Sequence, residues 1–363
     1  MAGCTTTSAA RRVPPGGKLR HACIGVRGMG GNDLQSFKDH PQLEIVALCD
    51  VDAKRLGEIG NRYGVIARYT DAAQLLADEE LDAIGMAVGP ALHGELGVQA
   101  LSRGLPVFME KPPAPTADAA QRLADEAARS GKPCIVGFMK RYSTANRIAG
   151  NILRSGSFGS PASILGQYTT APTYFSGDPD YTGFLLHHCV HAMDLIPWMM
   201  GQPVADVQVR AHEIEPGKLV LHAGFGFRFG GLATVVMGTN QSRGTPMEWW
   251  QVMSDHQRLE IRNVHEVRYY RNPPFKADVP DATLDPQQDT LMWEPNLTAA
   301  ANEDHKGYHA LLSAFLAAVR GEPNDAPTIV DGVAAMRVLE ALTRSMASGQ
   351  REVPDRSKPL SPQ

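Results

Sequence analysis

One lysine stands where the sequence predicts that chemistry can take place. Residues 107–113 read Val-Phe-Met-Glu-Lys-Pro-Pro, an apolar run that ends in Glu110, Lys111 and two prolines. The pattern predicts a buried strand that stops at the prolines, with Lys111 at its carboxyl end, where open α/β sheets bind ligands. A lysine on such a stiff turn can take part in proton transfer. The alternative interpretation is a solvated surface Glu-Lys pair.

A second group of titratable residues lies in 185–195, which reads Leu-Leu-His-His-Cys-Val-His-Ala-Met-Asp-Leu. If this stretch is a helix, His187, His191 and Asp194 project from one side. Imidazole titrates near neutral pH, so His191 can carry a proton to or from a substrate hydroxyl. Two alternatives stay open. One is a zinc site at His187 and His191, for which the spacing supplies no third ligand, and the other is histidines satisfied inside a packed helix.

A glycine-rich turn predicts a dinucleotide cofactor. Residues 24–31 read Ile-Gly-Val-Arg-Gly-Met-Gly-Gly, follow an apolar run and open a helix-like segment, as a dinucleotide fingerprint requires. Asp50 ends the next apolar run, where its carboxylate can accept hydrogen bonds from ribose hydroxyls and repels a 2′-phosphate, so NAD is favoured over NADP. Arg27 replaces the middle glycine of the fingerprint. Its guanidinium either crowds the pyrophosphate or swings aside and pairs with the phosphates.

In the first half of the chain, strands and helices alternate, which predicts a parallel, doubly wound sheet. The strand-like runs are Leu19–Val26, Leu43–Cys49, Ala83–Val88, Pro106–Met109 and Cys134–Phe138. The helix-like stretches between them end at Asp39 or cover Ala53–Tyr63, Asp71–Ala77, His93–Arg103 and Thr116–Ser130. For the last helix, Thr116 is the expected N-cap and Gly131 the expected stop.

Beyond about residue 137 the alternation ends, and a second domain with antiparallel hairpins is expected. Its strands are predicted at Val204–Ala211, Leu219–Phe229, Leu232–Thr239, Trp249–Ser254, Leu259–Arg262 and Glu266–Arg271, and its helices at Arg147–Arg154, Tyr308–Arg320 and Asp331–Met346. We therefore divide the chain into a polar tail (1–17), an NAD-binding Rossmann domain (18–137) and a substrate and oligomerisation domain (138–363). The C-terminal helices of the last domain can pack back on the first.

The composition excludes several classes of partner. A net charge of −4 over 363 residues, without clustered Lys and Arg, argues against nucleic acid and anionic membranes. No apolar run approaches the roughly 20 residues that cross a bilayer. The five cysteines are odd in number and irregularly spaced, so no disulfide framework is expected. Residues 1–4, Met-Ala-Gly-Cys, resemble the end of a lipoprotein signal. We expect a cytoplasmic protein, and the alternative is an exported one anchored through Cys4.

From about Lys18 to Val353 the chain resembles the Gfo/Idh/MocA family of oxidoreductases. The resemblance rests on several stretches in one order: 25–30, 47–52, 89–93, 110–112, 137–142 and 187–194. It implies a Rossmann domain, then an α/β domain with a large, open, mainly antiparallel sheet, and a homodimer or homotetramer. It also implies NAD(P)-dependent oxidation or reduction of a hydroxyl on a sugar, cyclitol or glycoside.

The resemblance also implies roles for particular residues. Lys111 matches the catalytic lysine, and His191 and Asp194 match the histidine and closing aspartate of the family's D-x-G-x-H-x-x-D pattern. That pattern's first aspartate is His187 here and its glycine is Cys189. His187 can replace the aspartate as a proton carrier but not as a fixed negative charge. The expected cofactor-binding residues are Gly25, Arg27, Met29, Gly30, Asp50, Val51, Val88, His93, Glu110 and Lys111, and the expected substrate contacts are Tyr168, Tyr174, Tyr181 and Arg141.

Three functions are weighed. The first is an NAD-dependent oxidoreductase acting on a secondary alcohol of a polyhydroxylated, sugar-like substrate, with Lys111 and His191 sharing the proton transfer and His187 and Asp194 supporting them. The second is an NAD-dependent glycosidase that oxidises its substrate transiently, without net redox change. The third is a non-catalytic sensor that binds dinucleotide or sugar, since a fold alone does not define a function.

Overall fold

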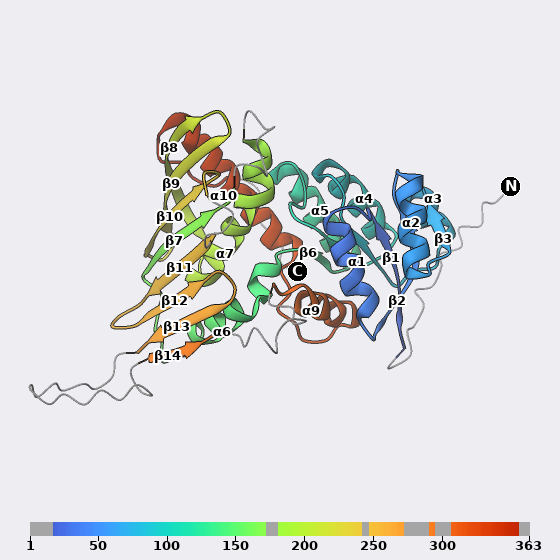
Figure 1. Cartoon of the computed structure of the whole chain (residues 1–363), viewed down its shortest axis with the longest axis horizontal. Coiled ribbons are helices and arrows are strands. Elements are labelled where there is room, and N and C mark those ends of the chain that lie inside the picture. The colour runs from blue at the N-terminus through green and yellow to red at the C-terminus, as the bar shows by residue number, and fades with distance from the viewer. Residues whose placement is uncertain (1–16, 172–180, 242–246, 272–289, 295–305, 356–363) are drawn as a thin grey trace, which may run out of the picture.

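The computed structural model describes residues 17–171, 181–241, 247–271, 290–294 and 306–355. Within these residues the chain forms two sheets, one parallel and one mixed, with helices between and around them (Figure 1). Tyr174, one of the expected substrate contacts, lies outside the described residues.

The first sheet has six parallel strands in the order β3-β2-β1-β4-β5-β6, so the predicted doubly wound sheet is confirmed. Its strands are β1 (Leu19–Ile24), β2 (Leu43–Cys49), β3 (Ala67–Tyr69), β4 (Ala83–Met86), β5 (Val107–Met109) and β6 (Cys134–Val136). The strand order reverses between β1 and β4, which places a ligand crevice at the carboxyl ends of these two strands. Strand β3 was not predicted, because three half-buried residues carry no readable periodicity.

The helices of this half begin and end at residues suited to those positions. They are α1 (Met29–Asp39), α2 (Ala53–Tyr63), α3 (Ala72–Asp78), α4 (Pro90–Ser102) and α5 (Ala117–Ser130). The Thr116 hydroxyl accepts a hydrogen bond from the Ala119 amide, and Gly131 ends α5 with a φ of 64°, so both predicted boundaries are confirmed. Asp52 caps α2 in the same way, by accepting from two backbone amides.

The second sheet has eight strands in the order β14-β13-β12-β11-β7-β10-β9-β8. They are β7 (Ser163–Thr169), β8 (Val204–Glu215), β9 (Lys218–Phe227), β10 (Leu232–Gly238), β11 (Glu248–Met253), β12 (Arg258–Arg262), β13 (Glu266–Tyr270) and β14 (Thr290–Trp293). All neighbours are antiparallel except β7 and β10, which confirms the mainly antiparallel sheet.

Two strands of this sheet, β7 and β14, were missed by the sequence prediction. Strand β7 lies in the middle of the sheet and carries Gly166. A Cβ at Gly166 would lie 2.6 Å from the ring of the fully buried Trp250 on β11. A glycine inside a strand reads as a break in the sequence, whereas here it makes room for an aromatic ring.

The helices of the second half connect the two sheets. They are the 3₁₀ helix η1 (Met139–Tyr142), α6 (Thr144–Leu153), the π-helix η3 (Phe184–Cys189), α7 (Val190–Met200), α9 (Tyr308–Arg320) and α10 (Ile329–Ser348). Helices α7 and α10 run between the large sheet and the first half, and α9 lies beside α1 (Figure 1). On α9, Phe315 is fully buried, and its ring centre lies 5.7 Å from that of Phe108 on β5.

Candidate active site

The two groups of titratable residues found in the sequence meet at the carboxyl end of β5. Lys111 follows β5, and its Nζ donates a hydrogen bond to the backbone carbonyl of His187, at 3.2 Å. Residues 76 positions apart in the chain are thereby joined across the boundary between the two halves. The structure thus brings the lysine of the first half to the histidine-rich segment of the second.

The glycine-rich turn has the geometry of a dinucleotide site. A Cβ at Gly25 would lie 2.2 Å from the Ala87 carbonyl oxygen, and one at Gly30 would lie 2.1 Å from the Gly25 carbonyl oxygen, so neither position admits a side chain. Gly28 has a φ of 48°, and a Cβ there would meet nothing within 4 Å. Open space therefore adjoins the N-terminus of α1, where backbone amides can bind a pyrophosphate. The residues present fit NAD.

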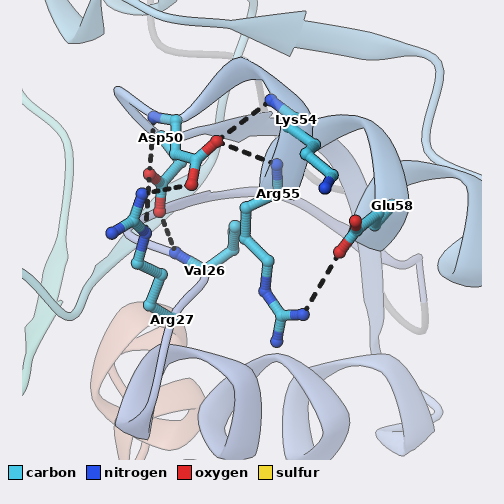
Figure 2. A network of polar contacts seen from close by, with 7 residues as sticks. Val26, Arg27, Asp50, Lys54, Arg55 and Glu58 are labelled. Atoms are coloured by element: carbon cyan, nitrogen blue, oxygen red, sulfur yellow. Dashed lines mark hydrogen bonds and ion pairs between the residues drawn. The ribbon is translucent and has the colours of Figure 1, made fainter.

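Arg27 turns away from this turn and toward the expected ribose site (Figure 2). Its guanidinium forms an ion pair with Asp52, and its Nε lies 3.6 Å from the Asp50 carboxylate. The two oxygens of Asp50 accept hydrogen bonds from the amides of Val26 and Asp52, each at 3.0 Å. Arg27 thus swings aside as one interpretation expected, but its partner in this structure is a carboxylate.

The other expected cofactor residues lie around this turn. Met29 is the first residue of α1, and Val51, which follows Asp50, is exposed. His93 is almost fully buried. Its Nε2 accepts from the Val88 amide at 3.1 Å, and its Nδ1 lies 2.9 Å from the Pro112 carbonyl oxygen, which requires Nδ1 to carry the proton. Burial lowers the pKa of His93 to about 4, so the neutral ring joins the turn after β4 to the turn that carries Lys111.

The histidine segment is not one regular helix. Residues Phe184–Cys189 form a π-helix, and α7 begins at Val190. His187 is consequently exposed, whereas His191 and Asp194 are buried in the interior. The α-helical spacing that predicted a single stripe does not apply across a π-turn, whose hydrogen bonds span five residues.

His191 is a buried, neutral imidazole. It is 6% exposed, and its Nδ1 has no hydrogen-bond partner among the described residues. Burial lowers the pKa of His191 well below its ordinary value, and the nearby ammonium groups of Lys111 and Lys140 lower it further. The ring is therefore neutral at pH 7. A neutral imidazole beside a lysine can exchange a proton with a bound hydroxyl.

Asp194 and Arg141 bind each other. Two guanidinium nitrogens of Arg141 donate to the two Asp194 oxygens, one of them at 2.8 Å, and Asp331 at the start of α10 also accepts from Arg141, at 3.0 Å. Burial raises the pKa of the Asp194 carboxyl, and the Arg141 guanidinium opposes that rise. The expected substrate contact Arg141 is thus engaged by two carboxylates, and the network ties η1 to α7 and α10.

A second polar group beside His191 was not singled out from the sequence. Lys140 forms an ion pair with Glu248 of β11, and its Nζ lies 5.0 Å from the ring centre of Tyr168. The Tyr168 ring stacks on His188 at 4.2 Å. Lys140 immediately precedes Arg141, so the Lys-Arg pair after β6 could have identified Lys140 from the sequence. Nothing in the sequence identifies Glu248 as part of this group, because only the pairing of β11 with β7 places it opposite Tyr168.

Tyr181, another expected substrate contact, forms hydrogen bonds away from the Lys140 and Tyr168 group. Its hydroxyl donates to the Glu213 carboxylate at 2.6 Å and accepts from the Gly217 amide at 3.2 Å, which ties it to the turn between β8 and β9. Four cysteines (Cys23, Cys49, Cys134 and Cys189) are buried thiols. In the described part of the chain, no group of three or more His, Cys, Asp or Glu residues is placed to hold a metal ion. Among those residues, no helix is long and apolar enough to span a membrane.

The fold and the glycine-rich turn define the class of a Rossmann-type nucleotide-binding enzyme, and comparison with known proteins agrees. Residues 19–138 match the family model described as "Oxidoreductase family, NAD-binding Rossmann fold", and residues 271–354 match its "C-terminal alpha/beta domain". The chain belongs to the Gfo/Idh/MocA oxidoreductase family, so the resemblance found in the sequence is confirmed. It is an NAD-binding oxidoreductase.

Individual relatives are distant. An inositol 2-dehydrogenase of Rubrobacter xylanophilus is 24% identical over 339 residues, which cover 90% of each chain. A D-apiose dehydrogenase of Paraburkholderia graminis is 30% identical over 188 residues, which cover 51% of this chain and 50% of the relative. An Agrobacterium radiobacter oxidoreductase, solved with NAD⁺, L-tartaric acid and magnesium, superposes with a TM-score of 0.79 at 21% identity, over 93% of this chain and 98% of that one. At that identity the likeness shows the fold.

Proposed function

We propose that the protein is an NAD-dependent dehydrogenase that acts on a secondary hydroxyl of a cyclitol or sugar. The observation that carries the proposal is the hydrogen bond from Lys111 Nζ to the His187 carbonyl, together with the effect of the Lys111 ammonium on His191, which supports joint action of this lysine and histidine. Relatives that are named inositol 2-dehydrogenase and D-apiose dehydrogenase support a polyhydroxylated substrate.

We assign separate roles in cofactor binding and proton transfer to the residues of the site. Open space at Gly28 receives the pyrophosphate, and Asp50 receives the ribose hydroxyls. Bound NAD supplies the hydride acceptor. Lys111 and His191 hold the oxygen of the reacting carbinol and share the transfer of its proton, and the unpartnered Nδ1 of His191 can accept a hydrogen bond from the hydroxyl. The buried network of Arg141 and Asp194 holds the helix that carries His191.

The test combines binding with turnover. Calorimetric titration of the purified protein is expected to show binding of NAD(H) at least about tenfold tighter than of NADP(H), because Asp50 repels a 2′-phosphate. A panel of cyclitols, sugars and glycosides should then include a substrate that yields one NADH per keto product. Release of an aglycone without accumulation of NADH would replace net oxidation by glycoside hydrolysis. Binding of NAD without turnover across the panel would favour the sensor.

We further propose that two copies pair through the outer face of the large sheet, since α7 and α10 cover its other face (Figure 1). Diagonal positions on β7, β10 and β11 carry apolar side chains on the outer face, with Leu165 and Leu232 exposed by 40% and 68%, although each directly paired position is polar. Such a patch fits an interface between subunits. The half-buried members of the same face are Val236, Trp249 and Met253.

Light scattering is expected to give twice the chain mass of 39.2 kDa. Leu165→Glu places a charge in this face and should yield monomers. The control is Ile66→Glu, at an apolar side chain that is 92% exposed on the first half of the chain, and it should leave the dimer intact. A native monomer, or a dimer that persists in Leu165→Glu, would contradict this pairing.

A further inference from the structure

Two buried carboxyl groups, which interact electrostatically with Lys111, are not used by the proposed mechanism. Asp33 projects inward from α1 and is 6% exposed, and Glu110, the last residue before Lys111, is 4% exposed. Oδ2 of Asp33 and Oε2 of Glu110 both lack a hydrogen-bond partner among the described residues. Buried charged oxygens without partners are costly, so at least one of the two groups should be neutral.

The surroundings of Glu110 are close-packed. A Cβ at Gly137 would lie 2.8 Å from Glu110 Oε1, so the glycine after β6 leaves room for this carboxyl group. Among the described residues, neither Asp33 nor Glu110 has an ion pair within salt-bridge distance. The cation that acts on both is the Lys111 ammonium. The two carboxyl groups therefore share one neighbouring cation.

Electrostatics supports a shared proton. Burial raises the pKa of Glu110 to about 7, and Lys111 opposes the rise. Burial also raises the pKa of Asp33 well above its ordinary value, and the neighbouring charge of Glu110 raises it further. Two carboxyl groups that repel each other in a dry site titrate as a pair, with one proton held between them over a wide pH range.

We infer that Asp33 and Glu110 form a carboxyl–carboxylate pair that stores a proton for Lys111. The inference rests on the proposed function for the direction of transfer. On oxidation, the substrate carbon loses a hydride to NAD and its hydroxyl loses a proton to the site. The Lys111 ammonium passes one proton to the carboxylate of the pair and takes up the substrate's proton in its place, directly or from His191, so Lys111 ends the step as an ammonium again. The pair releases the proton it received to water later, so charge and protons balance.

Infrared spectroscopy of the full-length protein without substrate tests the pair directly. At pH 7 the native protein should show the carbonyl band of a protonated carboxyl group, which shifts in D₂O. In Glu110→Gln the remaining Asp33 loses its like-charged neighbour, so its band should titrate at least about one pH unit lower. In Asp33→Asn the band of the Asp33 carboxyl group should disappear. Asp39→Asn, at an exposed carboxylate of the same helix, is the matched control and should match the native spectrum.

The relay to Lys111 is tested by kinetics. Glu110→Gln keeps the size of the side chain, so a packing role alone would leave turnover unchanged. The relay predicts a kcat about tenfold lower or more, with KM within threefold and an altered pH profile. No protonated-carboxyl band in the native protein would overturn the pair, and a native kcat in Glu110→Gln would overturn the relay. Because the infrared arm needs no substrate, its outcome is independent of whether the proposed dehydrogenase activity is found.

Discussion

Replacing Lys111 with alanine is expected to lower kcat by about a hundredfold or more, because loss of a positioned acid or base removes roughly that factor. The hydrogen bond of the ammonium is made to a backbone carbonyl, so the variant breaks no side-chain hydrogen bond among the described residues. Binding of NAD should persist, since Asp50 and the turn around Gly28 are untouched. The measurement is steady-state kinetics on the best substrate of the panel, together with calorimetric titration of NAD.

Two further variants separate proton transfer from charge. Lys111→Arg keeps a positive charge but carries a guanidinium, which does not give up its proton in proteins. It should therefore remain within about tenfold of the alanine variant. Lys38→Ala, at an exposed lysine on α1, is the control and should keep native kinetics. Near-native turnover in Lys111→Ala would remove the lysine from the mechanism, and full rescue by arginine would reduce its role to electrostatics.

Replacing Asp194 with alanine is expected to destabilise the fold by about 3–5 kcal/mol, because it leaves the Arg141 guanidinium buried with one remaining partner. That partner, Asp331, is 35% exposed and offers a weaker pairing than the 2% exposed Asp194. The network joins η1, α7 and α10, so its loss should loosen the helix that carries His191. Urea unfolding followed by circular dichroism measures the change.

The neutral isostere and a surface pair serve as controls for this effect. Asp194→Asn keeps a hydrogen-bond acceptor for Arg141 and should cost clearly less than alanine. Asp206→Ala removes the partner of Arg351 at the surface, and its effect should be much smaller because solvent screens that pair. A native urea midpoint for Asp194→Ala would mean that Arg141 finds another partner, and a loss of activity without loss of stability would place Asp194 at the substrate.

Several features of this protein could be predicted because they depend on neighbours along the chain. Thr116 and Gly131 end their helix through contacts within one turn, and Gly25 and Gly30 form the cofactor turn within six residues. The alternation of apolar runs and helices in the first half, and the helix at Tyr308–Arg320, follow from periodicity of the same short range. These patterns are sufficient to predict the Rossmann sheet and to recognise the family.

Tertiary structure decided what these residues contact. The ion pair of Arg27 with Asp52, the engagement of Arg141 by Asp194, and the position of Glu248 beside Lys140 all join residues distant in the sequence. The π-turn before Val190 separates His187 from His191, although their spacing suggests one face.

The sequence by itself therefore determined the class of fold, the cofactor turn and the presence of a lysine and a histidine suited to proton transfer. Only the tertiary structure decided which charges are paired and which are buried, including the unpartnered carboxyl oxygens of Asp33 and Glu110. The physical reason is that the free energy of a charge depends on burial and on partners from other elements, and both arise only when the two halves pack together.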